Sequence, residues 1–143
     1  RYRSKFINRL TIGGNNKYVE PAKTKSDRLS RDEEVVDAYI KDKKINFIFT
    51  LNAFYYMFKG MLYLYSKEYI YKIPKFLPII LLSGEQDPVG NFGKDVIRLY
   101  DNYKKELADV TIKLFKDDRH EILNELDKEN IYEDILKWIY EKS

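Results

Sequence analysis

The sequence predicts an α/β fold with a parallel sheet, and three observations lead to this class. Residues 79–82 form an unbroken apolar run bounded by turn-forming residues, which is typical of a strand covered on both faces. Residues 109–115 alternate apolar and polar side chains, which indicates a second, less buried strand. Between these runs, apolar residues recur at helical spacing over 92–107. Strand, helix and strand in this order predict a right-handed βαβ unit.

The composition is that of one ordinary globular domain of 143 residues. The chain has no cysteine, which excludes disulfides and thiolate metal sites. His120 is its only histidine, which excludes a multi-histidine metal site within one chain. We therefore expect no cofactor and no metal. The formal charge is only +3, with basic residues scattered among acidic ones, so we do not expect a nucleic-acid partner.

The amino-terminal part of the chain carries two weak helix signals. Residues 1–29 are polar and show little periodicity, so we expect irregular structure with a short helix over 4–10. Ser30 and Glu33 match a capping box, in which each side chain bonds the other residue's amide. The helix that this box begins should end near Lys43. Its apolar stripe consists of Val35, Val36, Tyr39 and Ile40.

Residues 47–65 are apolar nearly all round, and we expect a helix over about 51–65 with two covered faces. Asn52, Lys59 and the polar flanks argue against a transmembrane span. One stripe consists of Leu51, Tyr55, Phe58, Leu62 and Tyr65, and the other of Phe54, Met57, Met61 and Leu64. The second stripe is the better candidate for core because it carries no hydroxyl. Two interpretations stay open: both stripes form core, or one faces an apolar substrate channel.

Caps and spacing define the carboxyl-terminal helices. Asn91 fits the N-cap of the helix over 92–107, and a short helical turn is expected over 121–126. The last helix should begin near Asn130, with Glu133 at the capping-box glutamate position. Its apolar stripe consists of Ile131, Ile135, Trp138 and Ile139.

Two residues with complementary chemistry follow the two predicted strands. Asp87 lies in the loop after the first strand, and His120 lies shortly after the second. Because the carboxyl ends of parallel strands meet at one edge of a sheet, we expect these side chains to lie close together. A carboxylate that accepts the Nδ1 proton of an imidazole leaves Nε2 free to act as a general base. The alternative is two solvated loop residues, but the βαβ placement favours a catalytic pair.

Three stretches resemble the carboxyl-terminal third of α/β-hydrolases, most closely the bacterial group of lysophospholipases and of monoacylglycerol-lipase-like and serine-aminopeptidase-like enzymes. These stretches are 82–90 (L-S-G-E-Q-D-P-V-G), 119–125 (R-H-E-I-L-N-E) and 132–138 (Y-E-D-I-L-K-W). In that family the catalytic triad comes in the chain order Ser, Asp, His. The resemblance implies that Asp87 is the triad acid and His120 the triad base.

The resemblance also implies a division of the chain. Residues 1–72 correspond to the family's cap or lid, and residues 29–33 (L-S-R-D-E) look like a cap element of this group. Residues 73–143 correspond to the last βαβα portion of the α/β-hydrolase sheet. Within the cap, the candidate substrate-binding residues are Phe54, Phe58 and Met61.

The sequence departs from the family in two respects. Residues 116–119 (K-D-D-R) replace the proline and glycine that relatives often have before the histidine. No Gly-x-Ser-x-Gly motif occurs, so the amino-terminal half with the nucleophile would lie upstream of Arg1, and this chain alone would be inactive. A two-stranded parallel sheet with an open apolar edge also needs a neighbour. We therefore expect as partner either the missing half or a second copy of this chain.

Two classes of function follow. The first is a cytoplasmic serine hydrolase that cleaves carboxylic esters of the lysophospholipid or monoacylglycerol type, with at most peripheral membrane contact; an amide hydrolase of the aminopeptidase type stays open. The second, which the absent nucleophile favours, is a non-catalytic α/β module that binds a partner through its sheet edge and its tyrosine-rich surface, since the chain has 13 tyrosines.

Overall fold

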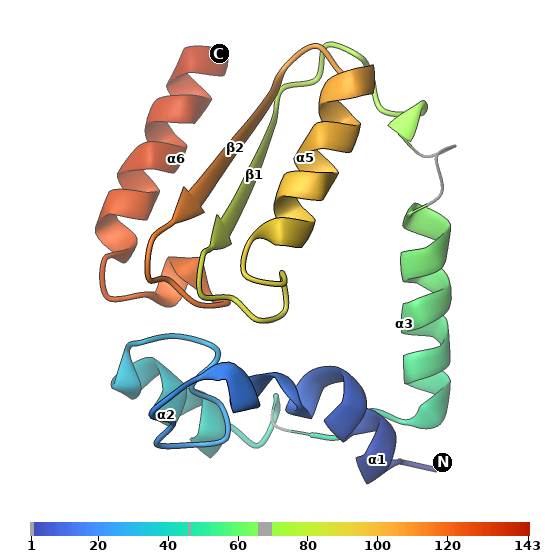
Figure 1. Cartoon of the computed structure of the whole chain (residues 1–143), viewed down its shortest axis with the longest axis vertical. Coiled ribbons are helices and arrows are strands. Elements are labelled where there is room, and N and C mark those ends of the chain that lie inside the picture. Colours follow the sequence, from blue (N-terminus) through green and yellow to red (C-terminus); the bar gives the residue numbers. More distant parts are fainter. Residues whose placement is uncertain (1, 46, 66–69) are drawn as a thin grey trace.

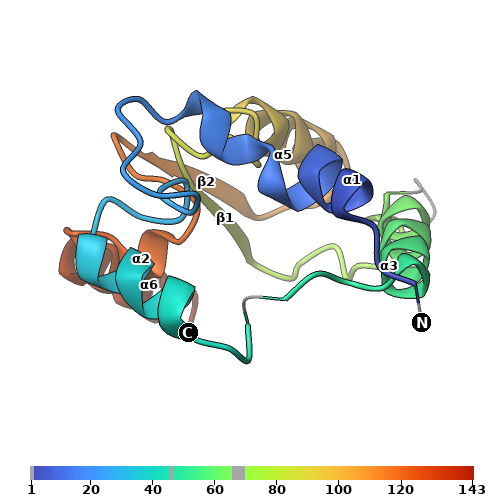
Figure 2. The same cartoon turned by 90° about the horizontal axis from the view of Figure 1, so that it is seen from below.

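The computed structural model describes residues 2–45, 47–65 and 70–143. Its carboxyl-terminal part has the predicted βαβα order. Strands β1 and β2 are parallel, with Ile79 opposite Val110 and Gly84 opposite Phe115. The sheet passes between α5 on one face and α6 on the other (Figure 1, Figure 2). The elements are β1 (Ile79–Gly84), α5 (Lys94–Glu106), β2 (Val110–Phe115) and α6 (Lys128–Lys142). The α/β class is therefore confirmed.

Alternation along β2 assigns its two faces to the two helices. On one face, Thr111 accepts a hydrogen bond from the indole nitrogen of Trp138 on α6 at 3.2 Å. On the other face, Leu114 packs against the start of α5, where a Cβ added to Gly93 would lie 2.9 Å from its side chain. Both faces of β2 therefore contact a helix, and residues 79–82 of the neighbouring strand β1, which carry no polar side chain, are half-buried.

The amino-terminal part of the chain lies below the carboxyl ends of the strands, and α3 lies to one side of the sheet (Figure 1). A single bridge, Arg3 to Thr50, joins the start of the chain to the start of α3. The elements are α1 (Lys5–Asn8), η1 (Arg9–Gly13), η2 (Asn15–Tyr18), α2 (Glu33–Lys41), α3 (Leu51–Leu64) and η3 (Ile122–Asn124). Ser4 caps α1 by accepting from the amide of Ile7 at 3.2 Å. The predicted boundary between residues 72 and 73 stays a prediction, and residues 1, 46 and 66–69 of that segment lie outside the described residues.

Three predicted helix starts are wrong. Asp32, not Ser30, caps α2, because its carboxylate accepts from the amide of Glu34 at 3.0 Å. Asn91 does not cap α5: it has a positive φ of 52°, and Gly93 takes the cap position with a φ of 78°. Helix α6 begins two residues before the predicted Asn130, at Lys128, so the expected capping box does not form.

The two covered faces predicted for α3 are also wrong. Of its side chains only Phe54 is buried, at 2% exposure, whereas Leu62 is 76% exposed. The other exposed apolar residues of this helix and its cap are Leu51, Tyr55, Tyr56, Phe58, Met61, Tyr63, Leu64 and Tyr65. The cause is that the described chain packs only one edge of α3. No helix among the described residues is long and apolar enough to cross a membrane.

The predicted apolar stripes of α2 and α6 are buried only in part. In α2 the buried residue is Val36, while Ile40 is 38% exposed. In α6 the buried residue is Ile131, while Ile139 is 47% exposed. In each helix the buried residue therefore lies in the first turn, although α6 also contacts β2 farther along through Trp138.

Candidate active site

The loops after β1 and β2 meet at the carboxyl end of the sheet, and Gly84 sets how closely they approach. A Cβ at Gly84 would lie 2.2 Å from the carbonyl oxygen of Asp118 and 2.4 Å from that of Arg119. Any side chain would collide with this backbone, so only glycine fits. The amide of Gln86 donates to the Asp118 carbonyl at 2.8 Å, which ties the two loops together. This junction brings the residues that follow each strand to one place.

Asp87 and His120 are brought together there, as the βαβ order predicts. The Nδ1 atom of His120 lies 3.0 Å from Oδ2 of Asp87. The other carboxylate oxygen, Oδ1, accepts from the amide of Val89 at 2.8 Å, which fixes the rotamer of Asp87. Asp87 is buried, whereas the side chain of His120 is 41% exposed. The imidazole therefore contacts a buried carboxylate through one nitrogen and reaches solvent with part of its ring.

The electrostatics favour a charged imidazole. The hydrogen bond to Asp87 raises the pKa of His120 above the ordinary value of 6.5; burial opposes this shift, and the charge of Asp87 adds to it. The nearby Arg28 acts in the lowering direction and Glu121 in the raising direction. Because Oδ2 of Asp87 accepts a hydrogen bond from Nδ1–H, the lone pair of the neutral imidazole is on Nε2. The pair can therefore accept a proton at Nε2 and stabilise the resulting imidazolium, which is the chemistry of a general base.

The backbone of residues 27–31 holds the loop that carries His120. We call these residues the support segment. The amide of His120 donates to the carbonyl of Arg28 at 3.2 Å, and the amide of Glu121 donates to that of Leu29 at 2.7 Å. The hydroxyl of Ser30 donates to the carbonyl of Asn124 at 2.8 Å. A segment predicted as cap thus pairs with the residues around the histidine.

A buried charged cluster lies beside this junction. The guanidinium of Arg31 contacts three carboxylates, with Glu125 at 3.0 Å, Asp127 at 2.7 Å, and Asp118 also in contact. Asp118 and Glu125 are both fully buried. Burial, with the charge of Asp127 adding to it and Arg31 opposing it, raises the pKa of Asp118 to about 6. The three carboxylates offer oxygens within 4.8 Å of one another, a set that could hold a metal ion, but the guanidinium lies among them.

The sequence alone did not indicate this cluster. Arg31 and Glu125 are 94 positions apart, and each lies in a charged stretch that looks like ordinary solvated surface. One signal was present. Glu125 is the last residue of the R-H-E-I-L-N-E stretch, five residues after His120. The intervening loop is short, so the carboxylate of Glu125 can reach the backbone of Arg119, next to the histidine.

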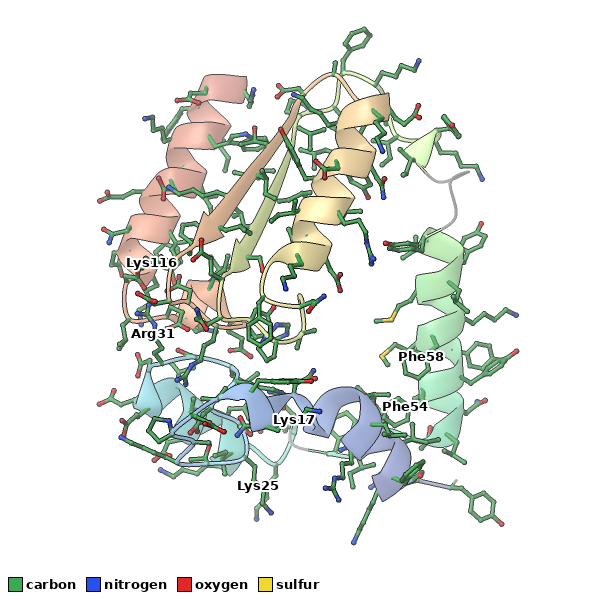
Figure 3. All side chains as sticks on the ribbon, viewed as in Figure 1. Lys17, Lys25, Arg31, Phe54, Phe58 and Lys116 are labelled. Atoms are coloured by element: carbon green, nitrogen blue, oxygen red, sulfur yellow. The ribbon has the colours of Figure 1, made fainter. Side chains whose placement is uncertain are left out.

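The candidate substrate-binding residues lie apart from the Asp87–His120 pair. Phe54 and Phe58 lie on α3, to one side of the sheet, whereas the loops after β1 and β2 lie at its lower end (Figure 1, Figure 3). The Phe54 ring is buried and stacks on Phe58 with centroids 6.0 Å apart. Met61 is 56% exposed. A substrate role for these residues stays a prediction.

Comparison with known proteins agrees with the α/β fold. The sequence model of the family described as "Serine aminopeptidase, S33" matches residues 1–127. Among curated proteins, none matches the chain. Among solved structures, a thermostable carboxyl esterase from Bacillus coagulans, in complex with glycerol, superposes with a TM-score of 0.86 at 28% identity, and the match covers 98% of this chain and 46% of that one.

Two further structures share the fold. One is a lipase in an open form, with a TM-score of 0.75 and 23% identity over 95% of this chain and 44% of that one. The other is a monoacylglycerol lipase from Paleococcus ferrophilus, with a TM-score of 0.65 and 21% identity over 100% of this chain and 56% of that one. The chain thus spans about half the length of each structure.

Proposed function

Because the chain belongs to the serine aminopeptidase family of α/β-hydrolases, we propose that it forms the carboxyl-terminal part of a serine hydrolase that cleaves carboxylic esters. The observation that carries the proposal is the 3.0 Å contact between His120 Nδ1 and Asp87 Oδ2 at the carboxyl end of two parallel strands. A buried carboxylate bonded to a partly exposed imidazole is the acid–base half of a triad. The remaining member would be a serine on a segment upstream of Arg1.

In this proposal each proton has a defined path. The serine hydroxyl attacks the acyl carbonyl and gives its proton to Nε2 of His120, and the imidazolium then gives that proton to the leaving alcohol. A water molecule then attacks the acyl-enzyme with the same proton transfers through His120, which releases the acid and regenerates the serine. Asp87 stays ionised throughout and stabilises the imidazolium through Nδ1. The solvent-exposed part of the His120 ring supports this role, since a base must reach a group outside its own chain segment.

The substrate is proposed to be a lipid-like ester such as a lysophospholipid or a monoacylglycerol. The support is the apolar surface of α3, where Leu62 and Leu64 are 76% and 64% exposed, together with the resemblance to esterases. In this proposal α3 acts as a lid over the acyl chain, and Phe54, Phe58 and Met61 line the acyl pocket. The cytoplasmic location is part of the same proposal.

The test uses the longest in-frame product that contains residues 1–143. It should hydrolyse short p-nitrophenyl esters, and His120→Ala or Asp87→Asn should lower kcat by about 10⁴-fold. Asp134→Asn, which removes a surface ion pair with Lys113, is the matched control and should keep full activity. An active His120→Ala variant would refute the assigned role. A product with no serine elbow and no esterase activity would favour the non-catalytic interaction module.

Amide hydrolysis is the second candidate function, because the matching family model is named for a serine aminopeptidase. The same triad attacks either carbonyl, so the choice depends on the leaving group and on a site for the substrate's amino group. Comparing kcat/KM for an aminoacyl p-nitroanilide with that for a p-nitrophenyl ester decides between them. A higher value for the anilide, after correction for its slower uncatalysed hydrolysis, would replace the ester assignment.

A further inference from the structure

We propose that Arg31 and Glu125 act as positioning residues for His120: their buried ion pair clasps the loop that carries the imidazole and holds it against Asp87. The inference rests on the proposed function, since it assigns how the base of that site is kept in place. It adds residues of the support segment to the machinery, although they precede the sheet in the chain and were predicted as part of a lid.

Glu125 is the centre of the clasp. Its Oε1 accepts from the amide of Arg119 at 2.8 Å, so the carboxylate holds the residue directly before His120. Its Oε2 accepts from the Nε of Arg31 at 3.0 Å, and the amide of Arg31 donates to the same carboxylate at 3.1 Å. Glu125 is 0% exposed, so each of these bonds forms away from water. One buried carboxylate thus joins both ends of the His120 loop to the support segment.

A second arginine completes the clasp in the opposite direction. The Nη1 atom of Arg119 donates to the carbonyl of Asp27 at 2.7 Å and to that of Ser30 at 3.1 Å. Arg31 therefore extends from the support segment to the loop, and Arg119 extends from the loop to the support segment. With the backbone bonds of His120 and Glu121 between them, the two segments are joined on both sides of the histidine.

The clasp matters because packing covers the imidazole only in part. The side chain of His120 is 41% exposed, so its position also depends on its backbone and on the hydrogen bond to Asp87. Figure 3 shows Arg31 between the part of the chain that carries α2 and the loop after β2. Asp118, two residues before His120, also contacts Arg31, so Arg31 holds the loop before the histidine as well as after it. A loop free to shift by 1 Å would lose the Nδ1–Oδ2 contact.

The decisive measurement follows His120 by proton NMR in the longest in-frame product that contains residues 1–143, with its resonance assigned by comparison with His120→Gln. Arg31→Met removes a positive charge, and by charge alone this change raises the pKa of His120. Loss of the contact with Asp87 lowers the pKa of His120 instead. We expect the pKa of His120 in Arg31→Met to fall toward the value measured in Asp87→Asn. Arg31→Lys, which keeps the charge but not the planar fork, should show a smaller fall.

Lys142→Met is the matched control, because it breaks an ion pair with Asp109 at the far end of α6 and touches no part of the loop. It should leave the His120 titration unchanged. If Arg31→Met does not fold, Glu125→Gln replaces it, since the amide oxygen can still accept from Arg119. The readout is then the Nδ1 proton resonance, which should broaden or disappear. A raised or unchanged pKa in folded Arg31→Met, or an intact Nδ1 resonance in Glu125→Gln, would overturn the proposal.

Kinetics of the longest in-frame product separate this inference from the proposed function. Arg31→Met should lower kcat by about 100-fold, as a misplaced base does, while KM changes less than about threefold. An unchanged kcat beside an inactive His120→Ala variant would overturn the clasp and leave the triad standing. An active His120→Ala variant would instead remove the proposed function, and the NMR titration would still decide whether the clasp holds His120.

Discussion

Two regions of the molecule differ in how far the described chain covers their side chains. One is the junction of the His120 loop with the support segment, and the other is the exposed helix α3. At the junction, Ser30, Asp118 and Glu125 are buried at 1% exposure or less, and each of these side chains forms hydrogen bonds within this chain. On α3, large apolar side chains such as Leu62 and Tyr63 face solvent at 76% and 59% exposure. Buried polar groups without partners are costly, and the first region supplies most of these partners itself, although Oδ2 of Asp118 is buried without a hydrogen-bond partner among the described residues. The second has an apolar surface that the described residues do not cover.

The same substitution in each region gives the largest contrast. Gly84→Ala should destabilise the chain by roughly 4 kcal/mol or prevent folding, because the new Cβ would lie 2.2 Å from the Asp118 carbonyl oxygen. Gly60→Ala on α3 meets nothing within 4 Å and should stabilise the helix by about 0.5–1 kcal/mol. Urea unfolding followed by Trp138 fluorescence measures both. Similar effects from the two changes would remove the distinction between the regions.

Removing the central carboxylate of the clasp should have the next largest effect. Glu125→Ala leaves the buried part of Arg31 and the amide of Arg119 without their shared acceptor, and we expect a loss of about 3 kcal/mol. The matched change is Glu33→Ala, which removes an exposed ion pair with Lys23 and should have a much smaller effect on stability. A stable Glu125→Ala variant would show that water replaces the carboxylate easily.

The raised pKa of Asp118 predicts a pH effect of defined sign. Its pKa in the folded state is about 6, above the ordinary value of 3.8. The free energy of unfolding should therefore fall as pH rises from 3.8 through about 6. Asp118→Asn mimics the protonated form and should flatten this dependence, with a gain of about 1–2 kcal/mol at neutral pH. Denaturant titrations across this range test it. A variant less stable than the parent at neutral pH would mean that the ion pair with Arg31 outweighs the burial.

The Asp87–His120 contact predicts a smaller pH effect in a higher range. A histidine with a raised pKa contributes stability below its ordinary value of 6.5, and the contribution is lost as pH rises through the folded value. Because the imidazole is 41% exposed, we expect less than about 1 kcal/mol. Asp87→Asn keeps the acceptor for Val89. In an Asp118→Asn background, which removes the change up to about pH 6, it should abolish the remaining difference between about pH 5 and about pH 8. A difference that persists in the variant would assign it to another group.

Changes on the exposed face of α3 should affect stability least. Leu62→Lys places a charge where the side chain is 76% exposed, so the free energy of unfolding should change by less than about 0.5 kcal/mol. If this face contacts a lipid or another chain segment, the variant should also self-associate less, which sedimentation measures. A large loss of stability would show that α3 is packed more tightly than its exposure indicates.

The contrast also explains which features the sequence could predict. The two strands and the Asp87–His120 contact follow from patterns within one βαβ unit, where strand order alone determines which loops meet. The start of α5 could not be predicted, because left-handed Asn91 and Phe92 replace the expected cap with a turn that Gly93 ends. The Arg31–Glu125 pair depends on tertiary folding across 94 positions, to which no local pattern is sensitive.

The exposure of α3 could not be predicted for a different reason. An apolar helix looks the same in sequence whether its own chain covers it, as for Phe54, or nothing in the described chain does, as for Leu62. Periodicity reports that a surface is suited to burial and does not report what buries it. The predicted N-cap of α2 is wrong for a related reason. Ser30 matches the capping pattern, but its hydroxyl donates to the carbonyl of Asn124 in the distant loop.

The 94-position separation between the support segment and the His120 loop also has a kinetic meaning. The β1–α5–β2 unit closes short loops and can form early, whereas the clasp must close a long one and brings its contacts late. The backbone amides of His120 and Glu121, which donate to Arg28 and Leu29, should therefore gain protection from hydrogen exchange after those of β2. The loop that carries the histidine should therefore become ordered after the strand before it, and its amides should exchange before those of β2 when the native state opens.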